Sequence, residues 1–181
     1  MDQGEVRIEA ERIWLRPLVE RDAEALFAYL GDAANMSFFP APFTRAEVGR
    51  MVARHGSQPA IDGRGFLAVI ERTSGELIGD CGVTRQMIDG KERDEIGYHF
   101  HAGWQGKGFA TEAARAVKRY GFETLGVSEL CSYMAADHWP SRRVAERNGM
   151  TVERTFNNPR NRDLPTVVYT IAREQYFAGT A

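Results

Sequence analysis

The sequence predicts one domain of mixed α/β structure over residues 1–181. Its length suits a single domain that buries its own hydrophobic core. Hydrophobic residues make up 43% of the chain and charged residues 27%, which is the balance of a globular protein. Segments of alternating hydrophobicity are interspersed with segments that have hydrophobic residues at helical spacing. The absence of repeats, linkers and low-complexity stretches favours a single folding unit.

One strand and two helices are predicted in the first third of the chain. Residues 7–16 alternate hydrophobic and charged side chains, which is typical of a strand. Residues 20–30 carry hydrophobic side chains at helical spacing, and Gly31 is a helix stop signal. After a loop, Thr44 is a good N-cap for a second helix that runs to about His55.

Six more strands and two more helices are predicted in the rest of the chain. A hairpin joins the first two of these strands through the turn Thr73-Ser74-Gly75-Glu76. Residues 106–125 place hydrophobic side chains on one face, as expected for a helix packed on a sheet, and form the longest predicted helix. The predicted strands are 65–71, 77–85, 93–100, 130–135, 150–156 and 166–172, and the last helix spans 141–148.

Charge and composition argue against several classes of function. The net charge of -2 argues against a nucleic-acid-binding protein, because affinity for phosphate backbones needs an excess of Lys and Arg. No apolar run approaches the length of a membrane span, and the N-terminal residues lack the apolar core of a signal peptide. Cys81 and Cys131 lie in separate apolar segments without metal-ligand spacing and are predicted to be reduced and buried. We therefore expect a soluble, cytoplasmic protein that binds neither nucleic acid nor membranes.

The most informative segment is a glycine-rich turn between a predicted strand and a predicted helix. Gly106 and Gly108 allow a tight turn that brings several backbone amides to one point, where the positive end of the helix adds its field. Such a turn suits a phosphate or pyrophosphate. A Walker A loop is excluded, because it needs Gly at position 101 and Ser or Thr after Lys107, where the chain has His101 and Gly108. A dinucleotide fingerprint that starts at Gly106 needs Gly or Ala at position 111 and finds Thr111.

The spacing Gln105-x-x-Gly108-x-Ala110 resembles the pyrophosphate loop with which the GNAT superfamily of N-acetyltransferases binds acetyl-CoA. The segments EIGYHF, WQGKGFATEAA and SRRVAERNGM resemble the RimJ/RimL-type branch of ribosomal-protein N-terminal acetyltransferases. The opening RIWLRPLVERDAEAL and the closing VVYTIAREQY extend this resemblance over nearly the whole chain. The resemblance implies a mixed, mostly antiparallel sheet of about seven strands with helices on both faces.

The resemblance also implies where acetyl-CoA binds. In the family, the strand before the pyrophosphate loop, here residues 95–101, splays from the next strand, here near residues 130–134, and the pantetheine arm enters the gap. Gly97 fits such a distortion, because glycine inside a strand often marks a bulge or a close backbone approach. Free amides at about Tyr98 to His101 are expected to hold the pantetheine and polarise the thioester carbonyl, as an oxyanion hole does. The residues expected to contact the cofactor are Tyr98, Phe100, His101, Gln105, Gly106, Lys107, Gly108, Phe109, Ala110, Thr111, His138, Ser141 and Arg142.

Direct attack by an acceptor amine requires that amine to be neutral, although a lysine amine has a pKa of roughly 10.4 and an α-amine roughly 8. Glu95 is the first candidate for the base, because it matches a strand position where many members of the superfamily place a catalytic glutamate. A structural role, such as pairing with Arg93, is the alternative for Glu95. His99 is the second candidate, because histidine exchanges its proton near neutral pH. An ordered water path is a further alternative to a side-chain base.

Ser141 occupies the position where this branch has a serine near the sulfur, so we assign it the acid or hydrogen-bonding role toward the leaving thiolate. A helix N-cap is an equally suitable role for this serine. The family usually has Asn-x-x-Ser, whereas this chain has His138-x-x-Ser141, so any contact of residue 138 with the cofactor arm is made by an imidazole. His99 and His101 have no third ligand at a sensible spacing, and no metal is expected.

The acceptor is an amine that the sequence does not identify. A protein N-terminus, a small polyamine, an antibiotic and an amino-acid amine all fit, and the branch resemblance favours protein N-termini. Residues 32–43 and 157–166 are expected to line the acceptor pocket, because loops carry specificity. A second hypothesis is a binding module that keeps the acyl-CoA cradle but senses CoA species, or supports a partner, without turnover. A homodimer is compatible with both hypotheses.

Overall fold

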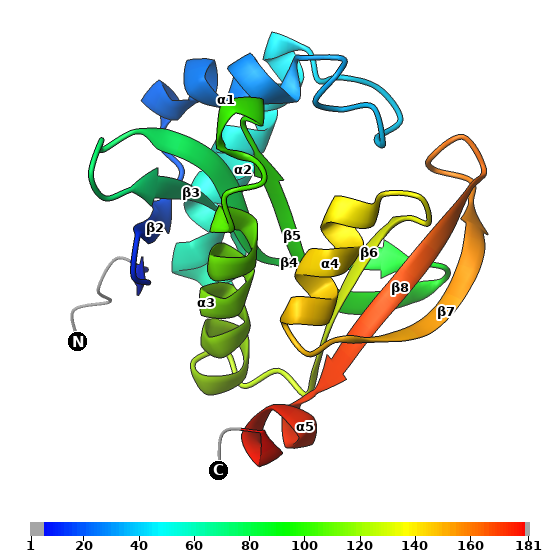
Figure 1. The fold of residues 1–181 in the computed structure, drawn as a ribbon. Coiled ribbons are helices and arrows are strands. Elements are labelled where there is room, and N and C mark those ends of the chain that lie inside the picture. Colours follow the sequence, from blue (N-terminus) through cyan, green and yellow to red (C-terminus); the bar gives the residue numbers. More distant parts are fainter. Residues whose placement is uncertain (1–5, 180–181) are drawn as a thin grey trace.

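A computed structural model describes residues 6–179, which form an eight-stranded sheet with helices on both faces (Figure 1). The strand order is β1-β2-β3-β4-β5-β6-β8-β7, and neighbours are antiparallel except for the parallel pair of β5 and β6. The predicted mixed, mostly antiparallel sheet is therefore confirmed. The strands are β1 (Ile8–Glu9), β2 (Ile13–Pro17), β3 (Gly65–Glu71), β4 (Leu77–Ile88), β5 (Lys91–Phe100), β6 (Glu129–Ala135), β7 (Thr151–Asn158) and β8 (Leu164–Ala172).

The prediction of one strand over residues 7–16 is wrong, because this segment forms the two strands β1 and β2. The extra strand is the reason why the sheet has eight strands. Ala10 donates its amide to the carbonyl of Ile13, and this turn folds β2 back on β1 so that Ile8 pairs with Leu15. Ile8, Ile13 and Leu15 are all buried in the same hydrophobic core. In one continuous strand Ile8 and Ile13 would point to opposite faces, because their separation is an odd number of residues. The hairpin brings both to the same face.

The helices include α1 (Ala23–Leu30), α2 (Arg45–Asp62), α3 (Phe109–Glu123), α4 (Trp139–Arg147) and α5 (Arg173–Ala178), with short 3-10 turns η1 (Glu20–Asp22) and η2 (Ala102–Trp104). The predicted end of α2 near His55 is wrong. The helix continues past a buried Pro59 to Gly63, which takes a left-handed φ of 75° as C-cap. Consequently α2, with 18 residues, is longer than α3, with 15, contrary to the prediction.

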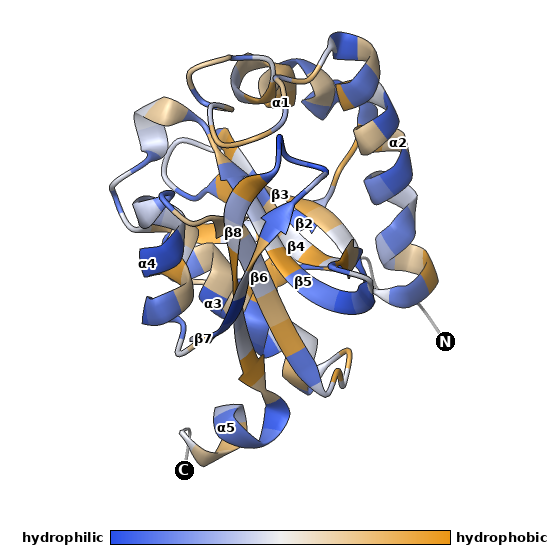
Figure 2. Cartoon of the chain, turned by 90° about the vertical axis from the view of Figure 1, so that its right-hand side faces the viewer, coloured by the Kyte–Doolittle hydropathy of each residue, from blue (hydrophilic) through white to orange (hydrophobic). Residues whose placement is uncertain are grey.

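Each face of the sheet has its own hydrophobic core. The core under α1 and α2 contains Leu26, Val48 and Ala68, and the core under α3 contains Leu67 and Val117. Alternation along β3 sends Leu67 to one core and Ala68 to the other. In Figure 2 the hydrophobic colour follows the central strands, whereas α2 and α4 carry both hydrophobic and hydrophilic residues. The sheet is therefore covered on both sides at its centre, where the candidate site lies.

The hairpin of β4 and β5 is longer than predicted. Its strands stay paired from Gly79 opposite Phe100 to Ile88 opposite Lys91. The two-residue turn Asp89-Gly90 has φ values of 45° and 77°, as a type I′ turn requires. This tight turn gives the sheet a long two-stranded tip beyond its centre.

The close packing of the central strands generates a prediction for Gly82→Ala. A Cβ at Gly82 would lie 1.9 Å from the carbonyl oxygen of Gly65 on β3, so we expect the substitution to lower the free energy of unfolding by at least about 2 kcal/mol. The same substitution at exposed Gly49 in α2 has no atom within 4 Å and is the matched control. There we expect stabilisation by about 0.5–1 kcal/mol, because alanine favours helix interiors. Urea unfolding measures both, and a Gly82→Ala protein as stable as the wild type would contradict the described packing.

Candidate active site

The parallel strands β5 and β6 separate in the middle of the sheet. Their register contains a single pair, Glu95 with Cys131, within the described chain. One residue further, the hydroxyl of Ser132 donates to the carbonyl of Ile96 at 2.8 Å. A side chain thus replaces the strand partner at this point. The predicted splay between these two strands is present.

The separation leaves backbone groups of β5 facing the gap. The carbonyl of Ile96 points toward β6, and with a strand period of two the groups of Tyr98 and Phe100 point the same way. The carbonyl of Phe100 accepts from Asn35 Nδ2 at 3.3 Å and from Gln105 Nε2 at 2.9 Å. Prediction of a free amide at His101 is wrong, because this amide donates to the carbonyl of Ile78 at 3.0 Å. The backbone groups open to a ligand are therefore the amide and carbonyl of Tyr98 and the amide of Phe100, because the Phe100 carbonyl is already occupied.

The glycine turn beyond β5 has the backbone that the sequence predicts. Gly106 and Gly108 adopt left-handed φ values of 73° and 86°. Gly108 is the N-cap of α3 and provides no side-chain hydrogen bond, so the first amides of the helix, from Phe109 onward, are not capped by it. Nothing lies within 4 Å of an ideal Cβ at Gly106. An uncapped helix start beside open space fits an anion such as a diphosphate.

The side chains of the turn are held by their own neighbours. Gln105 Nε2 donates to Asn35 Oδ1 at 2.8 Å in addition to its bond with Phe100. The ammonium of Lys107 donates to the carbonyl of Gly103 at 2.7 Å and lies 5.0 Å from the Trp104 ring centroid. Lys107 is therefore engaged with its own turn, and the turn offers backbone groups more than side-chain charge.

A basic hollow of about 310 Å³, which the sequence did not reveal, flanks the turn beside Gly108 and Thr111. Arg12, Arg115 and Arg147 border it together with Glu11 and Glu112, so the positive side chains outnumber the negative ones by one. Arg12 is bound to Glu112 at 2.8 Å and to the carbonyl of Lys107 at 3.0 Å. Arg115 and Arg147 are exposed. The hollow extends the positive field of the α3 N-terminus toward solvent.

Glu95 lies buried on the face of the sheet opposite α3. Thr84 on β4 donates its hydroxyl to Glu95 Oε2 at 3.3 Å. Burial disfavours the charged form and raises the pKa of Glu95 to about 7. The alternative that Glu95 pairs with Arg93 is wrong, since Arg93 binds Glu129 at 2.5 Å and Glu153 at 2.6 Å. Glu95 is a carboxyl group that exchanges its proton near neutral pH.

His99 lies on the same face of β5 as Glu95 and belongs to a buried network. Its Nδ1 lies 2.8 Å from Oδ2 of Asp80, a residue that is 0% exposed, and Tyr29 donates its hydroxyl to the other Asp80 oxygen at 2.7 Å. Burial alone would lower the pKa of His99, but the charge of Asp80 and its hydrogen bond raise it. The sequence signal for this network was the acidic Asp80 inside the apolar segment LIGDCGV.

An aromatic ring separates Glu95 from His99. A Cβ at Gly97 would lie 2.9 Å from Phe66, so glycine at this position makes room for the ring. The Phe66 and His99 ring centroids are 5.4 Å apart, and Phe39 lies 5.1 Å from His99 on the other side. The two candidate bases therefore occupy one face on either side of the Phe66 ring, and their charges still interact, since His99 lowers the pKa of Glu95 and Glu95 raises that of His99.

The start of α4 assigns different roles to His138 and Ser141. His138 is the N-cap, and its Nδ1 accepts from the Ser141 amide at 3.1 Å. The alternative of Ser141 as N-cap is therefore wrong. The Ser141 hydroxyl lies 2.9 Å from the hydroxyl of Tyr98, which reaches across the gap from β5. Arg142 is held by Tyr169 at 3.0 Å and by the carbonyl of Ala136 at 2.8 Å.

The two loops expected to line the acceptor pocket contact each other. Asn161 donates to the carbonyl of Phe38 at 2.8 Å, and Arg162 donates to the carbonyl of Ser37 at 3.0 Å. The Phe38 ring lies 4.0 Å from the ring of His138. The loop before α2 therefore bridges the β7–β8 connection and the start of α4.

Within residues 6–179, no group of three or more His, Cys, Asp or Glu side chains is arranged to hold a metal ion. No helix in the same part of the chain is long and apolar enough to cross a membrane. Cys81 and Cys131 are buried and form no disulfide.

The capping assignment predicts unequal effects for two alanine substitutions at α4. His138→Ala removes the N-cap acceptor and should lower the free energy of unfolding by about 1 kcal/mol, whereas His138→Asn should restore most of it. Ser141→Ala should change stability by less than about 0.5 kcal/mol, because the capping bond uses its amide. Denaturant unfolding measures all three. A larger loss for Ser141→Ala than for His138→Ala would reverse the assignment.

Comparison with known proteins agrees with this geometry. Residues 12–151 match the Acetyltransferase (GNAT) domain family. The uncharacterized N-acetyltransferase YnaD of Bacillus subtilis (strain 168) is 28% identical over 152 residues, or 83% of this chain and 86% of YnaD. A GNAT-family acetyltransferase from Bacillus anthracis superimposes with a TM-score of 0.80 at 28% identity, covering 93% of this chain and 99% of its own. RimL, a ribosomal L7/L12 α-N-protein acetyltransferase solved with coenzyme A, shares the fold with a TM-score of 0.78 at 16% identity, covering 94% and 99%. The chain belongs to the GNAT acetyltransferase family, as the glycine turn predicted.

Proposed function

We propose that this chain transfers the acetyl group of acetyl-CoA to a primary amine by direct attack in a ternary complex. The observation that carries the proposal is a buried carboxyl group, Glu95, with a pKa near 7 beside the point where β5 and β6 separate. A base with such a pKa can accept a proton at neutral pH and release it again. The match of residues 12–151 to the GNAT acetyltransferase domain supports this class of reaction, and the relative YnaD is named as an uncharacterized N-acetyltransferase.

The gap between β5 and β6 and the glycine turn both offer backbone hydrogen-bond donors to acetyl-CoA. The uncapped amides from Gly106 to Ala110 would hold the diphosphate at the start of α3. The backbone of Tyr98 and Phe100 would bind the arm and the thioester carbonyl. Thr111 and the basic hollow lie next to this turn and would face the phosphate that acetyl-CoA carries besides its diphosphate. Acetyl-CoA supplies the acetyl group, and the chain positions it.

Two side chains compete for the role of base. Glu95 accepts a hydrogen bond from Thr84 and, with a pKa of about 7, is about half ionised at neutral pH. His99 uses Nδ1 toward Asp80, which leaves Nε2 to act, but Asp80 raises the pKa of His99 and so keeps more of it protonated. A protonated imidazole cannot take a proton from the amine. We therefore assign the base to Glu95 and a supporting electrostatic role to His99.

The leaving thiolate needs a hydrogen-bond donor, which Ser141 and Tyr98 supply. Burial raises the pKa of Tyr98, so its hydroxyl keeps its proton. Tyr98 lies within hydrogen-bond distance of both oxygens of Ser141, at 3.1 Å from the carbonyl and 2.9 Å from the hydroxyl. Because His138 and not Ser141 caps α4, the Ser141 hydroxyl is not used in capping, and its partner in this structure is the Tyr98 hydroxyl. We propose Ser141 as the donor and Tyr98 as the residue that orients it.

Protein N-termini are the acceptor class that we favour. The supporting observation is the shared fold with RimL, whose substrate is a ribosomal protein N-terminus. The loops 32–43 and 157–166, which we propose line the acceptor pocket, contact each other through Asn161 and Phe38. The free, buried cysteines fit a cytoplasmic protein, which we propose as its location.

A binding module without turnover is the competing function, and His138 in place of the family's usual asparagine favours it. The His138 ring packs on Phe38, next to the gap. Release of free CoA thiol, measured against a panel of N-terminal peptides, polyamines and amino acids, separates the two functions. Amine-dependent release supports the enzyme, and tight CoA binding without release for any acceptor supports the module.

The turn geometry predicts the effect of Gly108→Val on cofactor binding. A valine at a φ of 86° is strained and crowds the start of α3, so the affinity for acetyl-CoA should fall by at least about 100-fold. Gly75→Val is the matched control, because Gly75 has a φ of 71° and open space in a distant turn. Calorimetric titration of each variant with acetyl-CoA is the measurement. Unchanged affinity in Gly108→Val would move the cofactor away from this turn.

The raised pKa of Glu95 predicts opposite effects of Glu95→Gln on activity and stability. Turnover should fall by about 100-fold or more, and the rise of the wild-type rate with pH through about 7 should disappear. The folded-state pKa of about 7 exceeds the ordinary 4.5, so the buried carboxyl group destabilises the wild type as pH rises through this range. Glu95→Gln should therefore be more stable above pH 7, by up to about 3 kcal/mol, and no more stable near pH 4.5.

Rate profiles and unfolding curves at several pH values test this, with exposed Glu76→Gln as the control. An unaltered pH profile would return the role of base to water.

A further inference from the structure

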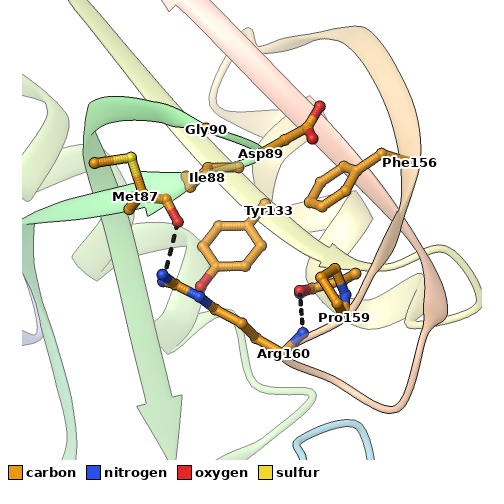
Figure 3. A pocket seen from close by; sticks show the side chains of 9 residues that line it. Met87, Ile88, Asp89, Gly90, Tyr133, Phe156, Pro159 and Arg160 are labelled. Carbon is orange, nitrogen blue, oxygen red and sulfur yellow. Dashed lines mark hydrogen bonds between the residues drawn. The ribbon is translucent and has the colours of Figure 1, made fainter.

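A second cavity lies on the same face of the sheet as Glu95. It has a volume of about 180 Å³ and lies between the tip of the β4–β5 hairpin, β6 and the end of β7 (Figure 3). Ile88, Tyr133, Phe156 and Pro159 provide apolar and aromatic walls. Ile88 is buried against Cys131, whereas Tyr133 and Phe156 are only partly buried. The cavity therefore offers aromatic surface that a ligand can cover.

The uncompensated charge of this cavity is positive. The carboxylate of Asp89 at the hairpin tip pairs with Arg154 Nη1 at 2.6 Å. Arg160 has no ion pair with a carboxylate in residues 6–179, and its Nη1 makes only a 3.3 Å bond to the carbonyl of Met87. Figure 3 shows the Arg160 side chain beside the Tyr133 ring. An anionic group on an apolar body is the ligand that this combination recognises.

Tyr133 connects the cavity to the proposed acceptor position. Cys131 is the parallel partner of Glu95, and Tyr133 follows two residues later on the same face of β6. The charge of Glu95 contributes to the raised pKa of Tyr133, after burial as the main cause. A molecule with its amine near Glu95 can therefore extend past Tyr133 toward Arg160.

The loop that carries Arg160 is fixed on both sides. Asn158 accepts from the Arg160 amide at 3.0 Å, and Asn161 and Arg162 bind the loop before α2. Arg162 and Asp163 adopt positive φ values of 55° and 53°, which non-glycine residues rarely take. Such a loop presents Arg160 without first having to be ordered, which favours binding.

We propose that this cavity is an acceptor subsite for an aromatic or apolar group that carries a carboxylate. The subsite rests on the proposed function, because it places the acceptor amine near Glu95. In a peptide acceptor, the group corresponds to an aromatic residue with a carboxylate beside it. Arg160 pairs with the carboxylate, and Tyr133 and Phe156 cover the apolar part.

Peptides with a free N-terminus, one to three glycines and a final phenylalanine test this subsite, each as the free acid and as the carboxamide. Binding to the protein loaded with CoA is measured by calorimetry, and turnover by CoA thiol release. For at least one peptide length, the acid should bind about tenfold more tightly than the amide. Arg160→Gln should remove this preference, and Arg160→Lys should keep part of it. Arg85→Gln, an exposed change on β4 outside the cavity, should leave it unchanged.

Equal binding of acids and amides at every length, or a preference that survives in Arg160→Gln, would overturn the subsite. A preference that depends on Arg160 but is accompanied by no thiol release supports the subsite and counts against the proposed acetyl transfer. In an active enzyme, Arg160→Gln should raise KM for the acid with little change in kcat. A fall in kcat alone would place Arg160 elsewhere in the mechanism and contradict the subsite.

Discussion

The departure of β6 from β5 directly after Glu95 and Cys131 is the constraint on which the rest of the structure depends. Buried backbone groups need hydrogen-bond partners, and a gap in the centre of a sheet withholds them. The chain meets part of this need with Ser132 on Ile96 and with Asn35 and Gln105 on Phe100. The backbone groups of β5 that remain without a partner face the gap, next to the start of α3. The same open groups that weaken the sheet form the binding site that we propose for acetyl-CoA.

The two faces of β5 divide the chemistry. Tyr98 points toward α4 and contacts Ser141, while Glu95 and His99 lie on the opposite face, where they contact Thr84 and Asp80 of β4. Alternation along one strand thus separates the groups that we propose for the leaving thiolate from those that we propose for the amine. Burial raises the pKa of Glu95 into the range that its proposed role as base requires, and it also makes the folded state less stable when Glu95 ionises. In this proposal, activity and stability oppose each other at Glu95.

The sequence predicted what is local and could not predict what depends on distant contacts. The glycine turn, the helix of residues 109–123 and the base candidate Glu95 follow from neighbouring residues and from the family pattern. The network of Tyr29, Asp80 and His99 joins residues up to 70 positions apart, and no periodicity reports it. One interpretation of the sequence made Ser141 the N-cap of α4, because serine is a good N-cap residue. In the structure the imidazole of His138 is the N-cap and accepts from the Ser141 amide. The Asp89-Gly90 turn was a readable signal for a longer hairpin that the prediction did not use.

A crystal structure of this chain with acetyl-CoA tests the central claim most directly. We expect the diphosphate to bind to the amides from Gly106 to Ala110. We expect the thioester to lie between β5 and β6, with its carbonyl at the backbone of Tyr98 or Phe100. The sulfur should lie within hydrogen-bond distance of the Ser141 hydroxyl. A complex in which β5 and β6 close on each other, or in which the diphosphate binds away from the start of α3, would contradict it.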